Sequence, residues 1–423
     1  MLWAVGSFRT NERLWLFFLI RSWWRNISSI KARFNLQHGG IITKLWWKKI
    51  LTKFLCLLLA ITCAISFSGC AFLEDLVDNI KNEFTPIDIE AGVGNLTNDD
   101  IQVIGDSEFS IHFLEVGNKY TGDCTYIKAG DNDILIDAGS RKNSAETIIN
   151  YVDQFCTDRT LEYVIATHAH QDHIAGFVGL SNSDGIFDYY TCETIIDYAK
   201  TNATSSIKED YEILRDLEVA NENANHYTAL ECYNNVGDAQ RIYQLSDNVI
   251  MSILYQKFYE QETGDENDYS VCLLFTYNGE NFLFTGDLEH EGEESLVESN
   301  SLPKCKVFKG GHHGSPTSNT PELLSIIKPE IVCVCCCCGS DEYTSNIANM
   351  FPSQQFVDNV APYTDAIYVT SIITEDERFT SMNGNIIIYF SDQSLAVRCT
   401  NDNKKFKDTD WFKTNRTKPS NWE

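Results

Sequence analysis

The sequence predicts a layered α/β protein, because paired apolar strands alternate with helical segments along the chain. Residues 124–130 and 133–139 form one pair of short apolar segments, and residues 270–277 and 281–285 form another. Each pair is joined by a short turn that contains glycine, which is typical of a β-hairpin. The chain has 423 residues, of which 43% are hydrophobic, so it can bury a large core.

The remaining predicted elements follow the same patterns, and together they place one folded domain at residues 106–400. Strands are expected at 109–114, 163–166, 305–309 and 331–338, with two more inside 241–255 and a last hairpin at 385–390 and 394–398. Helices are expected at 145–156, 205–225, 289–299 and 321–327.

Three histidines and one aspartate fall within six residues, directly after one of the predicted strands. Residues 167–173 read THAHQDH, and the whole chain has only 9 histidines. His168 and His170 are two residues apart, so they can point to one side of an extended loop, whereas Asp172 and His173 can point elsewhere. This division suits two neighbouring metal ions. Imidazole and carboxylate are the ligands of catalytic zinc, and they also suit manganese or iron.

Three further polar segments also follow predicted strands. Asp287 comes after Gly286, whose missing side chain permits a close approach of the backbone. His312 and His313 lie in a glycine-rich turn after another strand. Asp137 ends a strand and can accept a hydrogen bond that orients a ligand imidazole. Because strand ends meet at one edge of a sandwich of sheets, we expect these side chains to converge, with Asp287 able to bridge two ions.

The order and spacing of these motifs resemble the metallo-β-lactamase fold superfamily and, within it, the metal-dependent hydrolase domain related to the competence protein ComEC. The segments that carry the resemblance are FLEVG at 113–117, GDC at 122–124, ILIDAG at 134–139, THAHQDH at 167–173, FTGD at 284–287 and KGGHHGS at 309–315. The resemblance covers about residues 106–400. It implies a four-layer αββα sandwich with the site at one end of the sheets.

The resemblance also implies a role for each matching residue. His168 and His170 would hold one metal ion, and Asp172 with His173 would hold the other. Asp287 would bridge the two ions. Zinc is the first choice for both ions, and manganese is the second.

The later motif leaves two adjacent histidines to choose between. We favour His312 as the remaining metal ligand and place His313 nearer the substrate. Asp123 and Ser315 are expected to support the site without binding metal themselves, Asp123 beside a ligand and Ser315 beside an anionic substrate. The alternative for both is a local turn or helix cap.

Two features depart from the family pattern. Many relatives give the first metal a third histidine, and the only histidine between the first motif and Asp287 is His226, which we expect at the surface. A late Gly-His-Pro of ComEC-like domains is matched here by residues 350–352, which read MFP and offer no imidazole. These departures support an alternative function, a surface-anchored binding protein with a degenerate site.

The predicted activity is metal-assisted hydrolysis. Two ions would lower the pKa of a bound water, so that hydroxide exists at neutral pH without a nucleophilic side chain. Asp172 or Asp287 would take up or steer the proton, and His313 would lie beside the substrate. The resemblance makes a phosphodiester the first choice of substrate, nucleic acid included, and phosphate esters of envelope components the second. Either would be a small-molecule or oligomeric phosphoester, and lactam or thioester hydrolysis is less favoured.

The net charge of −27 is unevenly distributed. Ten basic residues and one acidic residue give residues 1–69 a net charge of +9, which leaves −36 for residues 70–423. A surface of this charge repels polyanions over long range. The predicted domain therefore lacks a basic face for nucleic acid, which would have to be bound locally at the metal ions.

The N-terminal segments predict a membrane-anchored protein that faces outward from a bacterial cell. Residues 1–46 are a basic extension. Residues 47–70 have three lysines, an apolar stretch and a final FSGC, which resembles a lipoprotein signal that is cleaved before a lipidated Cys70. A plain transmembrane anchor is the alternative. Residues 71–105 are predicted to be a flexible acidic linker, and residues 401–423 a loose polar tail.

The 15 cysteines show no regular pairs that would indicate a zinc ribbon or a disulfide framework. Five of them lie at 333 and 335–338, inside an apolar segment that ends at Gly339. Neighbouring residues on a strand point to opposite faces and cannot easily share an ion. We therefore expect a buried strand in which cysteine acts as a small apolar residue.

Overall fold

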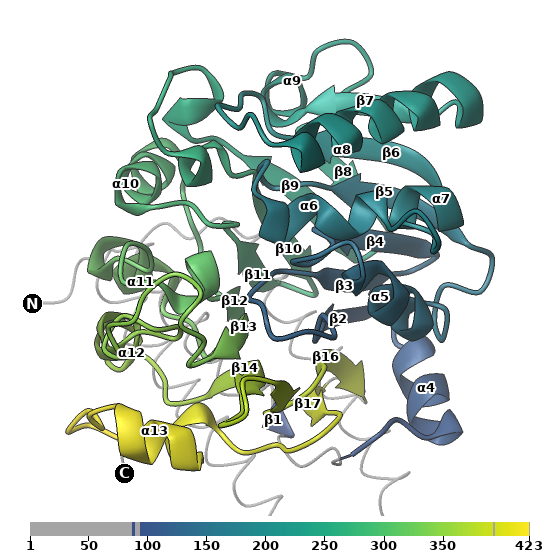
Figure 1. The fold of residues 1–423 in the computed structure, drawn as a ribbon. Coiled ribbons are helices and arrows are strands. Elements are labelled where there is room, and N and C mark those ends of the chain that lie inside the picture. The colour runs from purple at the N-terminus through teal and green to yellow at the C-terminus, as the bar shows by residue number, and fades with distance from the viewer. Residues whose placement is uncertain (1–86, 89–93, 392–393, 423) are drawn as a thin grey trace, which may run out of the picture. The chain divides into compact units, whose positions relative to one another are not determined.

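The computed structural model describes residues 87–88, 94–391 and 394–422 (Figure 1). The predicted signal segment, Cys70 and most of the predicted linker lie outside these residues. No helix within the described ranges combines the length and the hydropathy needed to cross a bilayer.

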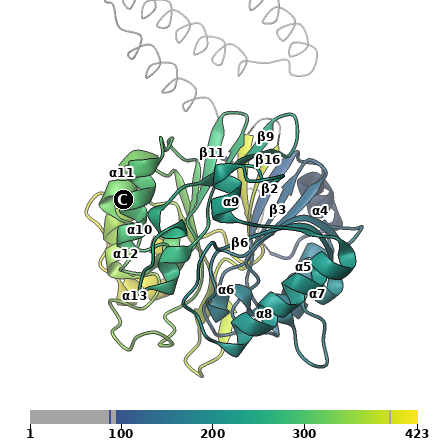
Figure 2. The ribbon, with the colours of Figure 1, turned by 90° about the horizontal axis from the view of Figure 1, so that it is seen from above.

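Two mixed β-sheets form the centre of the protein (Figures 1 and 2). The first has nine strands in the order β1-β17-β16-β2-β3-β4-β5-β6-β7, and the second has eight in the order β15-β14-β13-β12-β11-β10-β9-β8. The strands of the first sheet are β1 (Ile87–Asp88), β2 (Phe109–Phe113), β3 (Thr125–Ala129), β4 (Asn132–Ile136), β5 (Thr160–Ile165), β6 (Thr191–Asp197), β7 (Asn225–Thr228), β16 (Ile386–Ser391) and β17 (Ser394–Cys399). Those of the second are β8 (Ile242–Gln244), β9 (Val249–Leu254), β10 (Cys272–Tyr277), β11 (Glu280–Phe284), β12 (Val307–Lys309), β13 (Ile331–Cys338), β14 (Ile367–Ile373) and β15 (Phe379–Ser381).

Helices cover the outer face of each sheet (Figure 2). Those packed on the first sheet are α4 (Asn98–Gly105), α5 (Ser144–Val152), α6 (Gln171–Val178), α7 (Ile186–Tyr189) and α8 (Ser206–Leu217). Those packed on the second are α10 (His290–Ser299), α11 (Pro321–Ile327), α12 (Gln354–Val360) and α13 (Asp410–Asn415). The short α9 (Ala229–Asn234) packs at the edge where β7 and β9 lie.

Three hydrophobic clusters hold these layers together. The largest lies between the two sheets, where Phe109 of β2 packs against Phe275 and Phe282 of the second sheet at ring distances of 6.2 and 5.0 Å. The other two lie between each sheet and its helices. The two mixed sheets flanked by helices form a four-layer α/β sandwich, so the predicted four-layer arrangement is confirmed.

The cysteine-rich segment forms β13, in which all eight residues are buried. Its cysteines are free thiols, and burial raises their pKa values, so they remain protonated. The interpretation of this segment as a buried strand with cysteine in apolar positions is confirmed.

Both ends of the folded part are more ordered than the composition suggested. Part of the predicted flexible linker is helix α4, which begins with a capping box in which Thr97 and Asp100 exchange hydrogen bonds. In the predicted loose tail, Phe406, Phe412 and Trp422 are buried against the second sheet. A few large aromatic side chains are enough to fix a polar segment, and averaged composition conceals them.

Candidate metal centre

The predicted ligand segments follow neighbouring strands at one edge of the two sheets. Asp137 follows β4 and residues 167–170 follow β5, and these two strands are parallel neighbours. Asp287 follows β11 and the turn at 310–313 follows β12, which are again parallel neighbours. Neighbouring parallel strands end at the same edge of their sheet, so each pair of segments lies together. The two pairs meet where these edges of the two packed sheets face each other.

Four buried side chains form the centre of this meeting point. They are Asp123, His173, Asp287 and His313, and their ligand atoms all lie within 4.8 Å of one another. The Asp287 Oδ2 atom lies 3.0 Å from His173 Nε2 and 3.1 Å from His313 Nε2. We call these four residues the central cluster.

The remaining residues of the first motif border this cluster. His168 is buried, and its Nε2 atom lies 3.0 Å from His170 Nδ1. The ring of His168 is 4.2 Å from that of His173. Asp172 is in the first turn of α6, and its Oδ2 atom lies 3.4 Å from His313 Nε2. The structure therefore brings together the whole first motif, Asp287 and His313.

Asp137 fixes the orientation of the His173 ring. Its Oδ2 atom accepts a hydrogen bond from His173 Nδ1 at 2.8 Å, which turns the Nε2 atom toward Asp287. The same carboxylate accepts hydrogen bonds from the backbone N–H and the hydroxyl of Thr167, both at 2.8 Å. Asp137 adopts a left-handed backbone conformation with φ 59°, which is sparsely populated and tends to occur at functional sites.

The two adjacent histidines occupy different environments. His313 is fully buried, and its Nδ1 atom lies 2.9 Å from the carbonyl oxygen of Cys335 on β13. His312 is 16% exposed, and its Nε2 atom is 3.9 Å from Asp287, whereas its Nδ1 atom is 3.2 Å from Glu289. The geometry thus favours His313 as the late ligand, the reverse of the assignment favoured from the sequence. The metal-binding roles themselves stay predictions.

The charges at the centre depend strongly on one another. Burial alone would raise the pKa of Asp287, but the nearby imidazoles of His173 and His313 outweigh it and lower that pKa well below its usual value. Burial would likewise lower the pKa of His173 and His313, and the surrounding carboxylates reverse the effect and raise both. For His168, burial and two neighbouring imidazoles together lower the pKa.

A buried lysine completes the charge balance. Lys309, the last residue of β12, forms an ion pair with Asp123, and its Nζ atom is 4.0 Å from Asp287 Oδ1. Burial alone would lower the pKa of Lys309, but these two carboxylates raise it, so its charge is retained. Lys309 had no predicted role, although it is the first residue of the glycine-rich histidine motif.

The arrangement fits divalent metal ions. The buried Asp287 Oδ1 atom makes no hydrogen bond to a described residue, and His313 Nε2 lies near the carboxylates of Asp172 and Asp287 without a hydrogen bond of good geometry. A buried polar atom without a hydrogen bond is costly, so such atoms commonly mark an ion or water site. Imidazole nitrogen and carboxylate oxygen are ligands that zinc and manganese accept.

Gly286 makes the approach of the second sheet possible. It has φ 55°, and a Cβ atom there would lie 2.8 Å from Ser270 Oγ and 3.0 Å from Thr167 Cβ. Any other residue would therefore separate β11 from the first motif. The Ser270 hydroxyl accepts a hydrogen bond from the Asp287 N–H at 3.0 Å, which fixes the carboxylate where it can meet His173.

Other predicted residues lie around the centre. The Ser315 hydroxyl is 2.8 Å from that of Thr317, which is in turn 3.3 Å from His312 Nδ1. His226 is partly exposed on β7, where its Nε2 atom lies 2.9 Å from Asp197. Phe351, which replaces the late histidine of the family pattern, stacks on the His313 ring at 5.9 Å.

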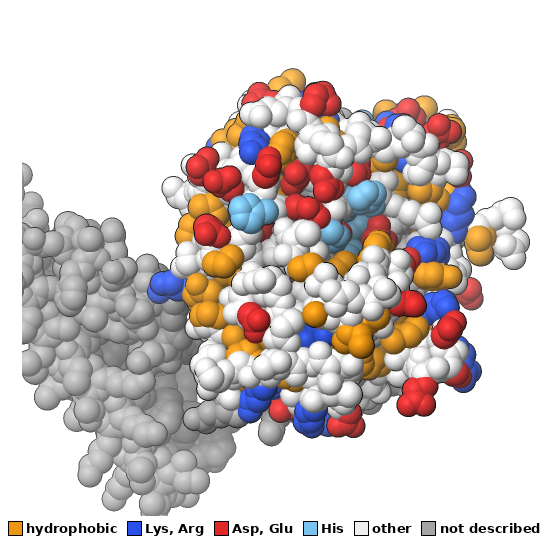
Figure 3. All heavy atoms as spheres, turned by 60° about the vertical axis from the view of Figure 1, so that its left-hand side comes forward, with side chains coloured by type: hydrophobic (Ala, Val, Ile, Leu, Met, Phe, Trp, Pro, Cys, Tyr) orange, Lys and Arg blue, Asp and Glu red, His pale blue; other side chains and the backbone are white. Residues whose placement is uncertain are grey.

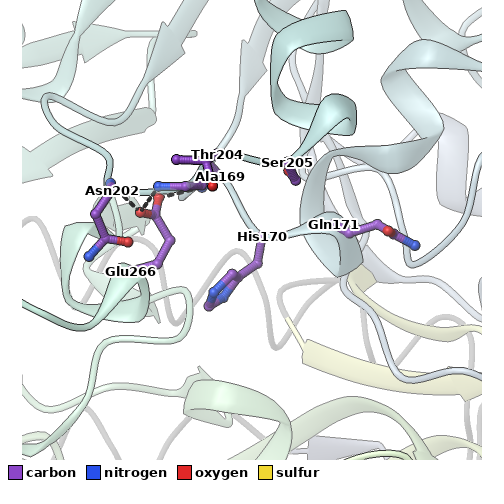
Figure 4. Close-up of a pocket in the computed structure, with 8 residues that line it drawn as sticks. Ala169, His170, Gln171, Asn202, Thr204, Ser205 and Glu266 are labelled. Carbon is purple, nitrogen blue, oxygen red and sulfur yellow. Dashed lines mark hydrogen bonds between the residues drawn. The ribbon is translucent and has the colours of Figure 1, made fainter.

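Glu266 clamps the first motif to a neighbouring loop (Figure 4). Its Oε1 atom accepts hydrogen bonds from the Ala169 N–H at 3.1 Å and the Thr201 hydroxyl at 2.9 Å. Its Oε2 atom accepts from the N–H groups of Asn202 at 2.7 Å and Ala203 at 3.1 Å. Because Ala169 lies between two predicted ligands, this carboxylate fixes the backbone that carries them. No sequence pattern indicates this contact, because Glu266 and Ala169 are 97 residues apart.

Glu266→Gln is expected to lower the free energy of unfolding by about 2–3 kcal/mol, because an amide group would face backbone donors that now share a charged acceptor. Chemical denaturation measures the change. Glu298→Gln, on the exposed side of α10, is the control and should leave stability unaltered. Equal stabilities of the two variants would show that the clamp contributes little.

A pocket of about 370 Å³ opens beside His170 (Figure 4). It is lined by Ala169, His170, Gln171, Asn202, Ala203, Thr204, Ser205 and Glu266. These described lining residues include no lysine or arginine. Figure 3 shows histidine side chains in a hollow on one face, with acidic side chains gathered beside them. The approach to the site is therefore acidic, in agreement with the negative charge of this part of the chain.

Residues 117–189 match the model of the metallo-beta-lactamase superfamily. This segment contains the first motif, Asp123 and Asp137. Together with the two flanked sheets and the buried His/Asp cluster, the match defines the chain as a protein with the metallo-β-lactamase fold.

Distant similarity also links the chain to competence proteins. It is 26% identical over 172 residues to ComE operon protein 3 of Bacillus subtilis strain 168, which is 41% of this chain and 19% of that protein. It is 39% identical over 72 residues to competence protein ComA of Neisseria gonorrhoeae, which is 17% of this chain and 10% of that protein. The chain thus spans less than a fifth of the length of these two curated relatives.

Among solved structures, the metallo-beta-lactamase fold protein YhfI from Bacillus subtilis is 9% identical to the chain. The comparison covers 63% of this chain and 96% of that one, with a TM-score of 0.34.

Proposed function

We propose that this protein is a metal-dependent hydrolase that uses two divalent ions, zinc first and manganese second, to cleave phosphodiesters or other phosphate esters. The observation that carries the proposal is the buried cluster of Asp123, His173, Asp287 and His313, bordered by the rest of the first motif. Bound metal ions would supply a hydroxide at neutral pH and neutralise charge on the reacting oxygens.

The protein's own residues would divide this work among them. His168 and His170 would hold one ion, and Asp172 and His173 would hold the other with His313. Asp287 would be shared by both ions. Asp137 keeps the His173 ring in the orientation that presents Nε2 to the centre. Asp172 or Asp287 would take up or steer the proton, and Asp172, with 13% of its side chain exposed against 2% for Asp287, is the more accessible of the two.

The acidic surroundings of the site limit the charge and length of the substrates that can reach it. Long polyanions would be repelled before they reach the site, and the effect grows at low salt. A short phosphodiester carries little charge and meets a smaller barrier. We therefore propose small or oligomeric phosphate esters as the main substrates, with nucleic acid bound only locally at the metal ions.

His170→Ala tests the proposal directly. We expect it to lower the bound metal and to reduce hydrolysis of bis(p-nitrophenyl) phosphate by at least about a hundredfold, because a direct ligand is removed. Elemental analysis and a spectrophotometric assay on the same samples measure both effects. His226→Ala is the matched control, since His226 contacts Asp197 away from the cluster. Undiminished turnover in His170→Ala would refute the assignment of the site.

The alternative is a surface-anchored binding protein with a degenerate site, which the absence of a late histidine at Phe351 favours. A purified protein that holds metal but leaves every phosphate ester intact would support this alternative over hydrolysis.

We also propose that the protein is anchored at the bacterial surface through a lipidated Cys70. The support is the lysine-rich and apolar pattern of residues 47–70. Cys70→Ser should release the protein from the membrane fraction or leave it unprocessed, as seen by fractionation and intact mass. A Cys70→Ser protein with the same mass shift and the same membrane association as the unaltered chain would contradict the anchor.

A further inference from the structure

One side of the centre is formed by residues 340–352, which connect β13 to α12; we call this segment the strap. Both ends of the strap are tied down. Glu342 forms an ion pair with Arg141 at 2.7 Å and accepts a hydrogen bond from the Thr121 N–H at 3.0 Å. Near the other end, Arg416 donates to the carbonyl oxygens of Ile347, Met350 and Pro352 at 2.8, 2.6 and 2.9 Å. The strap is therefore a fixed wall of the site.

Tyr343 of the strap reaches the centre. Its hydroxyl donates a hydrogen bond to Asp172 Oδ2 at 2.6 Å, and the same oxygen lies 3.4 Å from His313 Nε2. Its ring stacks on Phe351 at 5.4 Å, and Phe351 in turn stacks on His313. Tyr343 thus makes two contacts, the hydrogen bond to Asp172 and the ring contact with Phe351, and each of these partners lies beside His313.

The contact between Tyr343 and Asp172 could serve to position Asp172 or to place Tyr343 beside the substrate, and the exposure of Tyr343 bears on this choice. A tyrosine that served only to hold Asp172 would be expected inside the protein. Tyr343 is instead 50% exposed, although its hydroxyl ends at one of the predicted ligands. The exposed part of the side chain is therefore open to a substrate that binds beside Asp172, the residue that the hydroxyl contacts.

We propose that Tyr343 contacts the substrate directly. Its single O–H, which donates to Asp172 in this structure, would turn to donate to a phosphoryl oxygen bound beside that carboxylate. The proposal rests on the hydrolase function proposed above. A fixed donor stabilises an oxygen that gains negative charge in the transition state more than the same oxygen in the bound substrate. The residue would therefore act mainly on kcat.

Tyr343→Phe removes the hydroxyl and keeps the stacked ring. We expect it to retain its metal and to lose at least about tenfold in kcat with bis(p-nitrophenyl) phosphate, less than the roughly 10²–10³ that a buried oxyanion donor costs. The KM should change by less than about threefold, because the contact forms mainly in the transition state. Inorganic phosphate carries more negative charge on its oxygens than the diester and so resembles the transition state more closely, and the metal-loaded variant should bind it more weakly in calorimetry.

Tyr255→Phe is the matched control, since it removes a hydroxyl that donates to Glu260 at the same distance of 2.6 Å, outside the site. It should behave as the unaltered protein. A Tyr343→Phe variant with unchanged kcat and phosphate affinity would overturn the contact. So would a loss of metal that accounts for all of its loss of activity, because Tyr343 would then only position Asp172.

The two proposals fail in different ways. If the unaltered protein is active and Tyr343→Phe matches it, only the substrate contact is refuted. If the unaltered protein is inert but binds phosphate, the hydrolase function fails, and the phosphate affinity of Tyr343→Phe still decides the contact. If the unaltered protein neither cleaves esters nor binds phosphate, both proposals are wrong.

Discussion

Asp287→Asn is expected to reduce phosphodiester hydrolysis by more than about a thousandfold, which corresponds to roughly 4 kcal/mol of lost transition-state stabilisation. Its carboxylate lies 3.0 Å from His173 and 3.1 Å from His313, and it is the predicted bridge between the two ions. Asparagine has the same shape but no charge, so it cannot bridge two cations with equal strength. Metal content should fall together with activity.

Asp133→Asn is the control for this variant. Asp133 is also a buried carboxylate, but it lies at the start of β4 and pairs with Lys128 at 2.8 Å, away from the centre. It should retain metal and turnover even if it loses some stability. An Asp287→Asn protein with the metal content and rate of Asp133→Asn would exclude Asp287 from the metal centre.

Lys309→Met is expected to lower the free energy of unfolding of the metal-free protein by about 3–5 kcal/mol, the usual cost of leaving a buried charge without its partner. Lys309 is buried between Asp123 and Asp287, and methionine fills its volume without its charge. Without the ammonium group, two buried carboxylates repel each other. Denaturation of chelator-treated samples measures the change.

Added metal should restore part of this loss, because divalent ions supply the positive charge that the lysine provided. Lys404→Met, which removes a mostly exposed lysine paired with Asp402, is the control and should leave stability unaltered. A Lys309→Met protein as stable as that control in the absence of metal would show that the lysine does not balance the centre.

The convergence of the site could be predicted from the sequence because it depends on local rules. Asp137, residues 167–170 and Asp287 each come directly after an apolar segment that was recognisable as a strand. In a fold of two packed sheets, neighbouring parallel strands end at the same edge, so the residues that follow them must lie close together. The fold class followed from the same elements, even though five strands, β1, β6, β7, β14 and β15, were not predicted.

The finer arrangement could not be predicted because it depends on contacts between distant residues and on backbone conformation. His312 and His313 are adjacent in sequence and both have a left-handed backbone, with φ 47° and 54°. Only the folded turn decides that His313 points inward to Cys335 and Asp287. Glu266 and Tyr343 act on the first motif from 97 and 171 residues away.

The metal content of the purified protein is the most direct test of a buried His/Asp centre that binds catalytic ions. Elemental analysis should find about two divalent ions per chain, and chelation should remove them together with phosphodiester hydrolysis, which zinc or manganese should then restore. A protein that contains no metal as purified, takes up none on addition, or hydrolyses phosphodiesters equally well after chelation would contradict the account.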